Sequence, residues 1–321
     1  MRFNHLLAYL DTRRVANPAR TRACLASLAD LAAAHDARLT LCDVLEPPPA
    51  AAGRTSERVA ALRGRYVLTA LEHLAAELRG RVVAEYVLLE GSAFIAVSRH
   101  AARHGIDLVA VLDGTDGDGR PDATARHLVR KCPAPVWVMG PRGHGARQRL
   151  LVAVDRDIFP ATAAPRDMAG RLVDAAIALA RAQPASLHLA HAWQVYGAEL
   201  MEDPGLGLDA ADLEAYVDSQ RYSHHLWLEE LHDALRARLA ARGEIAFETT
   251  THLIEGDAAE VLPALARRLA VDALLLGTLG ASRAPGVLIG NTAEEILGRV
   301  GVPILALKPP GFESPLMAPD A

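Results

Sequence analysis

The 321-residue sequence has few cysteines and few aromatic residues. Its three cysteines, Cys24, Cys42 and Cys132, are widely spaced and form no C-x-x-C pair, which excludes a disulfide framework and a zinc ribbon. We expect them to be buried thiols in a reducing compartment. Aromatic residues make up only 4% of the chain, which disfavours a stacking platform for single-stranded nucleic acid.

The chain also lacks a basic excess and a long hydrophobic run. Lysine and arginine number 34 against 39 aspartates and glutamates, so the formal net charge is −5 and no nucleic-acid partner is expected. No segment reaches the ~18 consecutive apolar residues of a membrane span, and the N-terminus does not resemble a signal peptide. We therefore expect a cytoplasmic protein with no membrane partner.

What the sequence does have is an internal repeat. Five landmarks recur in the same order, which indicates a duplication rather than a coincidence. The matched segments are 6–11 with 150–155, 37–42 with 185–190, 88–93 with 253–258, 105–111 with 270–276, and 133–139 with 301–307.

Each repeat alternates short apolar runs with longer amphipathic segments. Runs of four to seven Val, Leu, Ile and Ala residues are typical of strands buried on both faces of a parallel sheet. The amphipathic segments predict helices at 19–35, 56–79 and 94–104, and at 166–182, 209–242, 258–269 and 293–299. This alternation predicts an α/β fold with the order β-α-β-α-β-α-β-α-β in each repeat.

The domain boundary is predicted in the Gly-, Pro- and charge-rich segment 140–147. We assign residues 1–143 to the first domain and residues 148–309 to the second. Residues 310–321 contain three prolines, Pro310, Pro315 and Pro319, and are predicted to be a tail.

The most informative motif lies between a predicted strand and a predicted helix of the second repeat. It has the pattern G-x2-G-x9-G-N-T, formed by Gly277, Gly280 and the run Gly290-Asn291-Thr292. Ligands bind at the carboxyl ends of strands in open parallel sheets, and glycines there let the backbone approach a ligand. The unpaired N–H groups of a helix that begins at Gly290 favour an anion, so the motif predicts a phosphate site.

This motif resembles the universal stress protein family. The run G-N-T-A-E-E-I-L at 290–297 and the run P-I-L-A-L-K-P at 303–309 are similar to the second half of its tandem, E-type members. The resemblance covers both repeats at the level of the fold, but only the second repeat carries the motif. It implies two tandem Rossmann-like domains of the adenine nucleotide alpha hydrolase-like type, each a five-stranded parallel sheet with helices on both faces.

The resemblance also implies ATP as the ligand, with Mg²⁺ as a candidate companion. Carried over to this sequence, Asp155 at the end of a strand is expected near the adenosine, and Ala192, just beyond the next strand, near the base. The residues expected to line the base, ribose and phosphates are Leu276, Gly277, Gly280, Gly290, Asn291 and Thr292. Leu279 departs from the pattern, because ATP-binding relatives can have a basic residue there.

The first repeat is predicted to have lost the site. Its loop is three residues shorter, and Asp122 stands where the second repeat has Gly290. Further carboxylates at Asp113, Asp116 and Asp118 would repel a phosphate. The EF-hand pattern is not met, so no metal site is expected there.

Other candidate features are weaker. His225, Glu229 and His232 share one face of a predicted helix, but the H-E-x-x-H motif is absent and a solvated polar face is favoured over zinc. Residues 196–220 form a long predicted connection that could cover a ligand or be a surface excursion. No nucleophile–base set is evident, so no catalytic residue is assigned.

We therefore expect a stress-response binding module that is regulated by ATP in its second domain. Two alternatives stay open: a slow ATP-hydrolysing enzyme, and a nucleotide-free binder of an apolar small molecule that uses residues 196–220. The last strands of the repeats, at 136–139 and 304–307, are candidates to pair the domains as a pseudo-dimer or to form a homo-oligomer.

Overall fold

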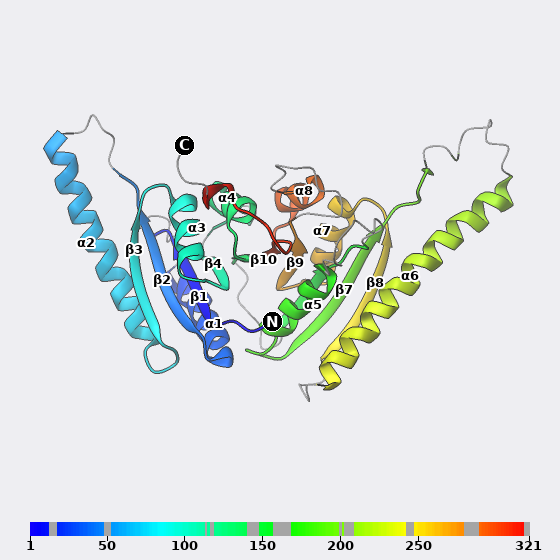
Figure 1. Ribbon diagram of the computed structural model, residues 1–321, viewed down its shortest axis with the longest axis horizontal. Coiled ribbons are helices and arrows are strands. Elements are labelled where there is room, and N and C mark those ends of the chain that lie inside the picture. Colours follow the sequence, from blue (N-terminus) through cyan, green and yellow to red (C-terminus); the bar gives the residue numbers. More distant parts are fainter. Residues whose placement is uncertain are drawn as a thin grey trace.

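The computed structural model (Figure 1) describes most of the chain. The described residues are 1–12, 18–47, 53–112, 114–115, 119–139, 148–156, 168–198, 201, 209–241, 247–278 and 289–317. The predicted boundary segment 140–147 lies outside them.

The first half contains five strands and four helices in the predicted alternation. They are β1 (His5–Leu10), α1 (Pro18–His35), β2 (Arg38–Leu45), α2 (Gly53–Leu78), β3 (Ala84–Glu90), α3 (Ala93–Arg103), β4 (Leu108–Leu112), α4 (Ala123–Lys131) and β5 (Val136–Val138). β1, β2, β4 and β5 coincide with short apolar runs, because residues buried on both faces of a sheet must be apolar. The edge strand β3 has no fully buried residue and carries Glu85 and Glu90.

The second half repeats this order. Its elements are β6 (Gln148–Ala153), α5 (Met168–Leu179), β7 (Ala185–Trp193), α6 (Ala210–Ala241), β8 (Glu248–Glu255), α7 (Ala258–Arg268), β9 (Ala273–Gly277), α8 (Asn291–Arg299) and β10 (Ile304–Leu307). A short 3-10 helix, Pro315–Met317, follows β10. The α/β alternation predicted from the sequence is confirmed.

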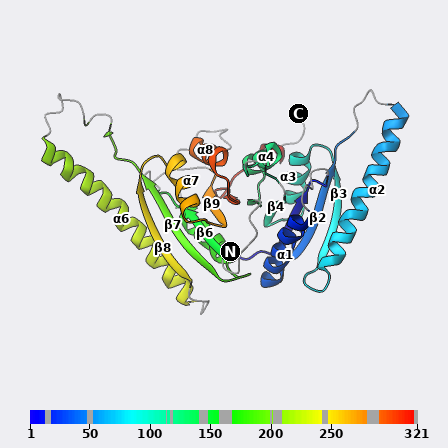
Figure 2. The ribbon, with the colours of Figure 1, turned by 180° about the vertical axis from the view of Figure 1, so that it is seen from behind.

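The two halves share one ten-stranded sheet with the order β3-β2-β1-β4-β5-β10-β9-β6-β7-β8. Neighbouring strands are parallel within each half, whereas β5 and β10 pair antiparallel, with Leu305 opposite Trp137. Figure 2 shows the same arrangement from behind, with α2 and α6 at opposite ends of the molecule. The last strand of each half therefore joins the halves, and each covers the edge that the other would leave exposed.

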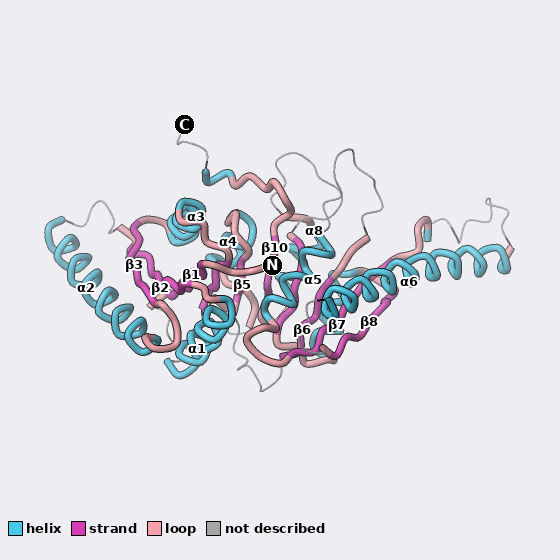
Figure 3. The backbone as a smooth tube through the Cα atoms, turned by 60° about the horizontal axis from the view of Figure 1, so that its bottom comes forward, coloured by secondary structure: helices cyan, strands magenta, loops and turns pink. Residues whose placement is uncertain are grey.

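Helices cover both faces of the sheet (Figure 3). One apolar core contains buried residues of α1, α2, α5 and α6, and the core on the other face contains buried residues of α3, α4, α7 and α8. Both cores include residues from the two halves. A hydrogen bond also joins the two halves: Nε2–H of His35 in α1 donates to the carbonyl of Ala178 in α5 at 2.9 Å.

The segment after β10 packs on the first half, although the sequence predicts a tail from residue 310. The buried ammonium of Lys308 donates to the carbonyl of Arg130 at 2.7 Å, and the Ser314 hydroxyl donates to the carbonyl of Lys131 at 2.6 Å. These bonds satisfy carbonyls at the C-terminal end of α4 that the helix itself cannot. Burial lowers the pKa of Lys308 to about 7.

The structure bears on the cysteines and on membrane-spanning helices. All three cysteines are buried and unbridged, as predicted. Among the helices that the structure describes, none is long and apolar enough to cross a membrane.

Candidate functional site

The carboxyl ends of β6 and β9 bring most of the predicted site residues to one edge of the sheet (Figure 1). β6 and β9 are parallel neighbours, with Val152 opposite Leu275. Asp155 follows the end of β6, and its side chain is 77% exposed. Leu276 and Gly277 are the last two residues of β9. A carboxylate and a glycine therefore stand at the point where a ligand of an open α/β sheet binds.

Ala192 lies inside a strand rather than just beyond it, so this part of the prediction is wrong. β7 continues to Trp193 because its pairing with β8 extends to Trp193 opposite Glu255. Ala192 is partly buried against the core on the α7 and α8 face of the sheet. Its proximity to a base stays a prediction.

Both ends of the glycine-rich loop are held by backbone hydrogen bonds. The N–H of Thr278 donates to the carbonyl of Leu307 at 2.9 Å, and the N–H of Gly290 donates to the carbonyl of Thr278 at 2.8 Å. These bonds bring Gly290 beside the end of β9. The predicted residue Gly280 falls in the segment 279–288, outside the described residues.

Helix α8 begins where the motif predicts, with Gly290 as its N-cap and Asn291 as its first residue. As a glycine, the N-cap residue Gly290 provides no capping side chain. The side chains of Asn291 and Thr292 are exposed. Among the described residues, the N-cap position of α8 therefore supplies no side chain to its first N–H groups, which is compatible with an anion at this helix end.

The corresponding helix of the first half is capped by the chain itself. Asp122 is the N-cap of α4, and its carboxylate accepts the N–H of Ala125 at 2.8 Å. The N–H of Asp122 donates to the carbonyl of Gly114 at 2.8 Å. In the second half, the N–H of Gly290 makes the equivalent bond to the carbonyl of Thr278. The predicted correspondence between Asp122 and Gly290 therefore holds in space, whereas Asp113, Asp116 and Asp118 lie outside the described residues.

Next to Asp155 lies a pair of histidines, His191 and His224, that the sequence interpretation did not bring together. Nδ1–H of His191 donates to the carbonyl of Val154 at 3.1 Å, and Nε2 of His191 is 2.8 Å from Nδ1 of His224. Because the carbonyl fixes the His191 proton on Nδ1, the His224 Nδ1–H must be the donor of the second bond. Burial lowers the pKa of both imidazoles, and His191 is only 1% exposed.

This histidine pair connects the end of β6 to α6. The indole of Trp227 contacts the His191 ring edge-on at 4.9 Å, and the guanidinium of Arg156 donates to the Ser223 hydroxyl at 2.7 Å. β7 carries two histidines, His188 and His191, and only His191 is fully buried, so the sequence alone does not single it out.

The histidines that the sequence did single out do not form a metal site. His225 is exposed, whereas His232 and Glu229 turn toward β8, where they hydrogen-bond to the Thr249 and Thr251 hydroxyls at 2.7 and 3.0 Å. The interpretation of one solvated face was therefore wrong for two of the three residues. Within the described ranges, no three His, Cys, Asp or Glu side chains are placed to hold a metal ion.

The predicted connection 196–220 overlaps the predicted helix 209–242, and in the structure the shared residues are helical. Helix α6 begins at Ala210, so residues 210–220 are helical, and Tyr196 is tied to the helix because its N–H donates to the Gln220 amide oxygen at 2.9 Å. Residues 199–200 and 202–208 lie outside the described part of the chain.

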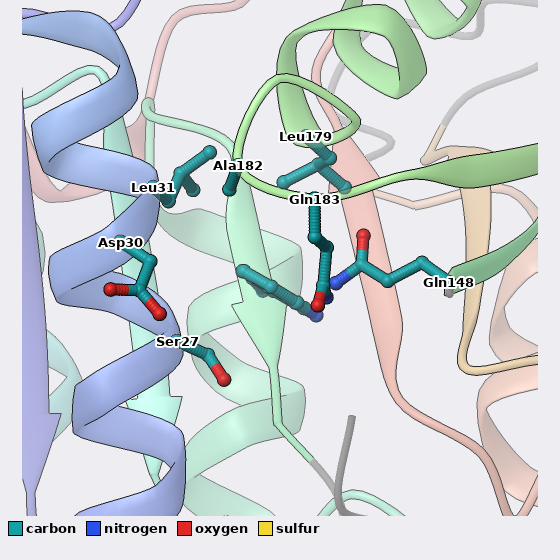
Figure 4. Close-up of a pocket in the computed structure, with 8 residues that line it drawn as sticks. Ser27, Asp30, Leu31, Gln148, Leu179, Ala182 and Gln183 are labelled. Atoms are coloured by element: carbon teal, nitrogen blue, oxygen red, sulfur yellow. The ribbon is translucent and has the colours of Figure 1, made fainter. Parts of the chain in front are cut away.

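A small pocket lies elsewhere, between the two halves (Figure 4). It is lined by Ser27, Asp30, Leu31, Trp137, Gln148, Leu179, Ala182 and Gln183. Gln148 is the first residue of β6, so the pocket opens at the end of that strand opposite to Asp155. It is separate from the edge that carries the glycine motif.

Comparison with known proteins identifies the family. The model of the universal stress protein family matches residues 15–140 and 146–308. Universal stress protein E of Escherichia coli K12 is 30% identical over 197 residues, which cover 60% of this chain and 57% of that protein. The Universal stress protein E homolog of Haemophilus influenzae is 27% identical over 183 residues, 57% of this chain and 54% of that protein. The matched region thus spans little more than half the length of these relatives.

Solved structures agree on the fold. A universal stress protein from Archaeoglobus fulgidus has a TM-score of 0.60 and 14% identity, and covers 96% of this chain and 99% of its own. A functionally unknown protein from Pseudomonas aeruginosa PAO1 has a TM-score of 0.60 and 19% identity, and covers 96% and 93%. The chain therefore belongs to the universal stress protein family, a family of stress-response proteins, as a tandem member with one family domain in each half.

Proposed function

We propose that this protein is a nucleotide-binding regulator with one ATP site, at the carboxyl ends of β6 and β9 in its second half. The observation that carries the proposal is the N-terminus of α8. Its N-cap is Gly290, without a capping side chain, at the point where the first half has the carboxylate of Asp122. A helix end with free N–H groups binds an anion, whereas one that already holds a carboxylate repels it.

In this proposal three parts of the chain hold the nucleotide. The backbone of Gly290, with the exposed side chains of Asn291 and Thr292, binds phosphate oxygens. The exposed carboxylate of Asp155 accepts hydrogen bonds from the adenosine. Gly277, at the end of β9, lets the ligand approach the backbone. Bound Mg²⁺ would neutralise phosphate charge, and the residues here act by binding and orienting.

We assign the protein a regulatory rather than a catalytic role. Acid–base catalysis needs a side chain within hydrogen-bond reach of the reacting group and a pKa near the working pH. His191 and His224 are the titratable pair nearest to Asp155, and they are bonded to each other and to the Val154 carbonyl. Bound ATP is then a signal, which changes the affinity of this edge of the sheet for a partner.

The substitution Gly290→Asp tests the proposal. It places in the second half the residue that the first half uses, so α8 gains a cap while the phosphate meets a fixed carboxylate. Calorimetric titration with Mg-ATP should show binding to the wild type and a weakening of at least about 100-fold in Gly290→Asp. At 100 times Kd, ATP should stabilise the wild type by about 2.7 kcal/mol in thermal unfolding.

The matched control is Asp122→Gly in the first half, which should leave ATP binding unchanged. Mass spectrometry of the molecules released from the purified protein identifies any bound ligand directly. The proposal fails if ATP does not stabilise the wild type, or if Gly290→Asp binds it equally well. Steady phosphate release that Gly290→Asp abolishes would indicate a hydrolase, and release of an apolar molecule would indicate a binder of such compounds.

A further inference from the structure

Helices α4 and α8 lie next to each other where the two halves meet (Figures 1 and 2). Arg130, in the last turn of α4, pairs with Glu294, in the first turn of α8. Its Nε–H donates to one carboxylate oxygen at 2.8 Å and its Nη2–H donates to the other, and the two side chains are 33% and 34% exposed. A guanidinium that forms two parallel bonds fixes the orientation of its partner as well as its distance.

This ion pair has no counterpart in the opposite direction. When the N-caps of the two helices are aligned, Arg126 matches Glu294, and Gly298 matches Arg130. Arg126 is exposed, and Gly298 has no side chain with which α8 could reach α4. The first half therefore supplies a charged group to the helix that begins the proposed ATP site and receives none in return.

The charge of Glu294 bears directly on a phosphate at this helix end. A carboxylate in the first turn of a helix repels an anion that binds at the same N-terminus. The guanidinium of Arg130 compensates this charge, so the positive end of the α8 dipole stays available next to Gly290. Without Arg130, the second half would place an uncompensated carboxylate near its own anion site.

The backbone of Arg130 connects the same ion pair to the C-terminal part of the chain. We call residues 309–317, which follow β10, the strap. The ammonium of Lys308 donates to the carbonyl of Arg130 at 2.7 Å. One residue earlier, the carbonyl of Leu307 accepts the N–H of Thr278, at the start of the glycine-rich loop, at 2.9 Å. The point where the strap leaves the sheet therefore holds both Arg130 and the loop.

The strap itself docks on the first half. Figure 1 shows it in red, running from β10 toward α3 and α4. The Ser314 hydroxyl donates to the carbonyl of Lys131 at 2.6 Å, and the guanidinium of Arg99 in α3 donates to the carbonyl of Leu316 at 3.1 Å. A continuous set of contacts thus runs from the first turn of α8 through Arg130 to the strap.

We propose that Arg130 is a positioning residue for the nucleotide site and that it couples ATP binding to the docking of the strap. This inference rests on the proposed function. The ion pair keeps Glu294 from repelling phosphate, and it holds the end of α4 where its carbonyls receive Lys308 and Ser314. Bound ATP then favours the paired state and the docked strap, and by reciprocity the docked strap raises the affinity for ATP.

A double-mutant cycle tests the role of the charge. Arg130→Ala keeps the backbone carbonyl but leaves Glu294 unpaired, so calorimetric titration with Mg-ATP should show binding that is about two- to fivefold weaker. Glu294→Gln should not weaken binding, and Arg130→Ala/Glu294→Gln should regain affinity, because no uncompensated carboxylate remains. A purely structural role of Arg130 would not give this rescue. The matched control Arg126→Ala, on the same helix, should bind ATP like the wild type.

Hydrogen exchange of residues 310–317 tests the coupling. Mg-ATP should slow this exchange in the wild type and leave it unchanged in Arg130→Ala. Ser314→Ala, which loosens the strap away from the site, should weaken ATP binding, because the coupling is reciprocal.

Three results would overturn the inference while ATP still binds: full affinity in Arg130→Ala, no rescue in the double variant, or exchange of the strap that ATP does not change. A wild type that binds no ATP would overturn it together with the proposed function.

Discussion

The two halves of this protein place different residues at the same point of one fold. At the start of α4 the first half has Asp122, whose carboxylate accepts the N–H of Ala125, and at the start of α8 the second half has Gly290, which has no side chain to do the same. Both residues are held by the same backbone bond to the end of the preceding strand. A single side chain therefore distinguishes the helix end that is capped by its own N-cap residue from the one at which we propose that an anion binds.

A second pair of equivalent positions shows the same contrast. In β2, the buried carboxylate of Asp43 accepts the N–H and the hydroxyl of Thr12 at 3.0 and 2.6 Å, which ties down the chain after β1. The matching residue of β7 is His191, which binds the Val154 carbonyl and leaves the carboxylate of Asp155 exposed. The first half buries a carboxylate at this point, whereas the second half has a buried imidazole there and an exposed carboxylate at Asp155.

The largest expected effect breaks the connection between the halves. Trp137 in β5 is 2% exposed at the strand that joins them, so Trp137→Ala should cost roughly 3–5 kcal/mol. At about 2–4 °C per kcal/mol this lowers Tm by roughly 10 °C. Differential scanning calorimetry should show one transition that moves as a whole. The control Tyr86→Ala, on the edge strand β3, should change Tm little. Two separate transitions would contradict the prediction, because they would show that the halves unfold as independent domains.

The next effect separates the two strand-end aspartates. Asp155→Ala should weaken ATP binding about tenfold, which is the loss of one hydrogen bond to a charged group. Asp11→Ala, at the equivalent position of the first half, should leave the affinity for ATP unchanged. Calorimetric titration of both variants measures the difference, and equal losses would place nucleotide in both halves.

A smaller effect concerns stability without ligand. Asp122→Ala removes the cap of α4 and should cost about 1 kcal/mol, whereas Gly290→Asp adds a cap to α8 and should stabilise by a few tenths of a kcal/mol. Urea unfolding of both variants measures whether the free energy of unfolding falls in Asp122→Ala and rises in Gly290→Asp. If Gly290→Asp were destabilising, its loss of ATP binding would reflect damage to α8 rather than a blocked site.

The smallest expected effect is a dependence on pH. Burial lowers the pKa of His191 below the ordinary 6.5, so the unfolded chain takes up a proton that the folded chain refuses. The stability that neutral His191 contributes is present above pH 6.5 and declines as the pH falls below it. The difference in Tm between the wild type and His191→Asn should therefore be larger at pH 8 than at pH 5.5. An unchanged difference would show that His191 is not the titrating group.

Much of the fold was predictable because its signals are local. Apolar runs between turn residues located most of the strands, and the helical pattern predicted at 293–299 begins two residues after the first residue of α8, Asn291. The prediction failed where the answer depends on contacts between residues that are far apart in the sequence. Ala192 was placed outside its strand because only the ladder with β8 shows that β7 continues to Trp193. His191 and His224 were missed because the chain positions of two residues do not show that a strand and a helix bring them into contact.

The sequence by itself determined the duplication, the α/β alternation and the inequality of the two helix ends at Asp122 and Gly290. These features follow from residue type and spacing, because they depend on interactions between residues that are close together in the sequence. Only the tertiary structure decided that β5 and β10 pair antiparallel to form one sheet, and that the segment around Lys308 and Ser314 caps α4 in the other half. Such contacts join residues more than 150 positions apart, and they depend on which surfaces are left to bury after each half has folded.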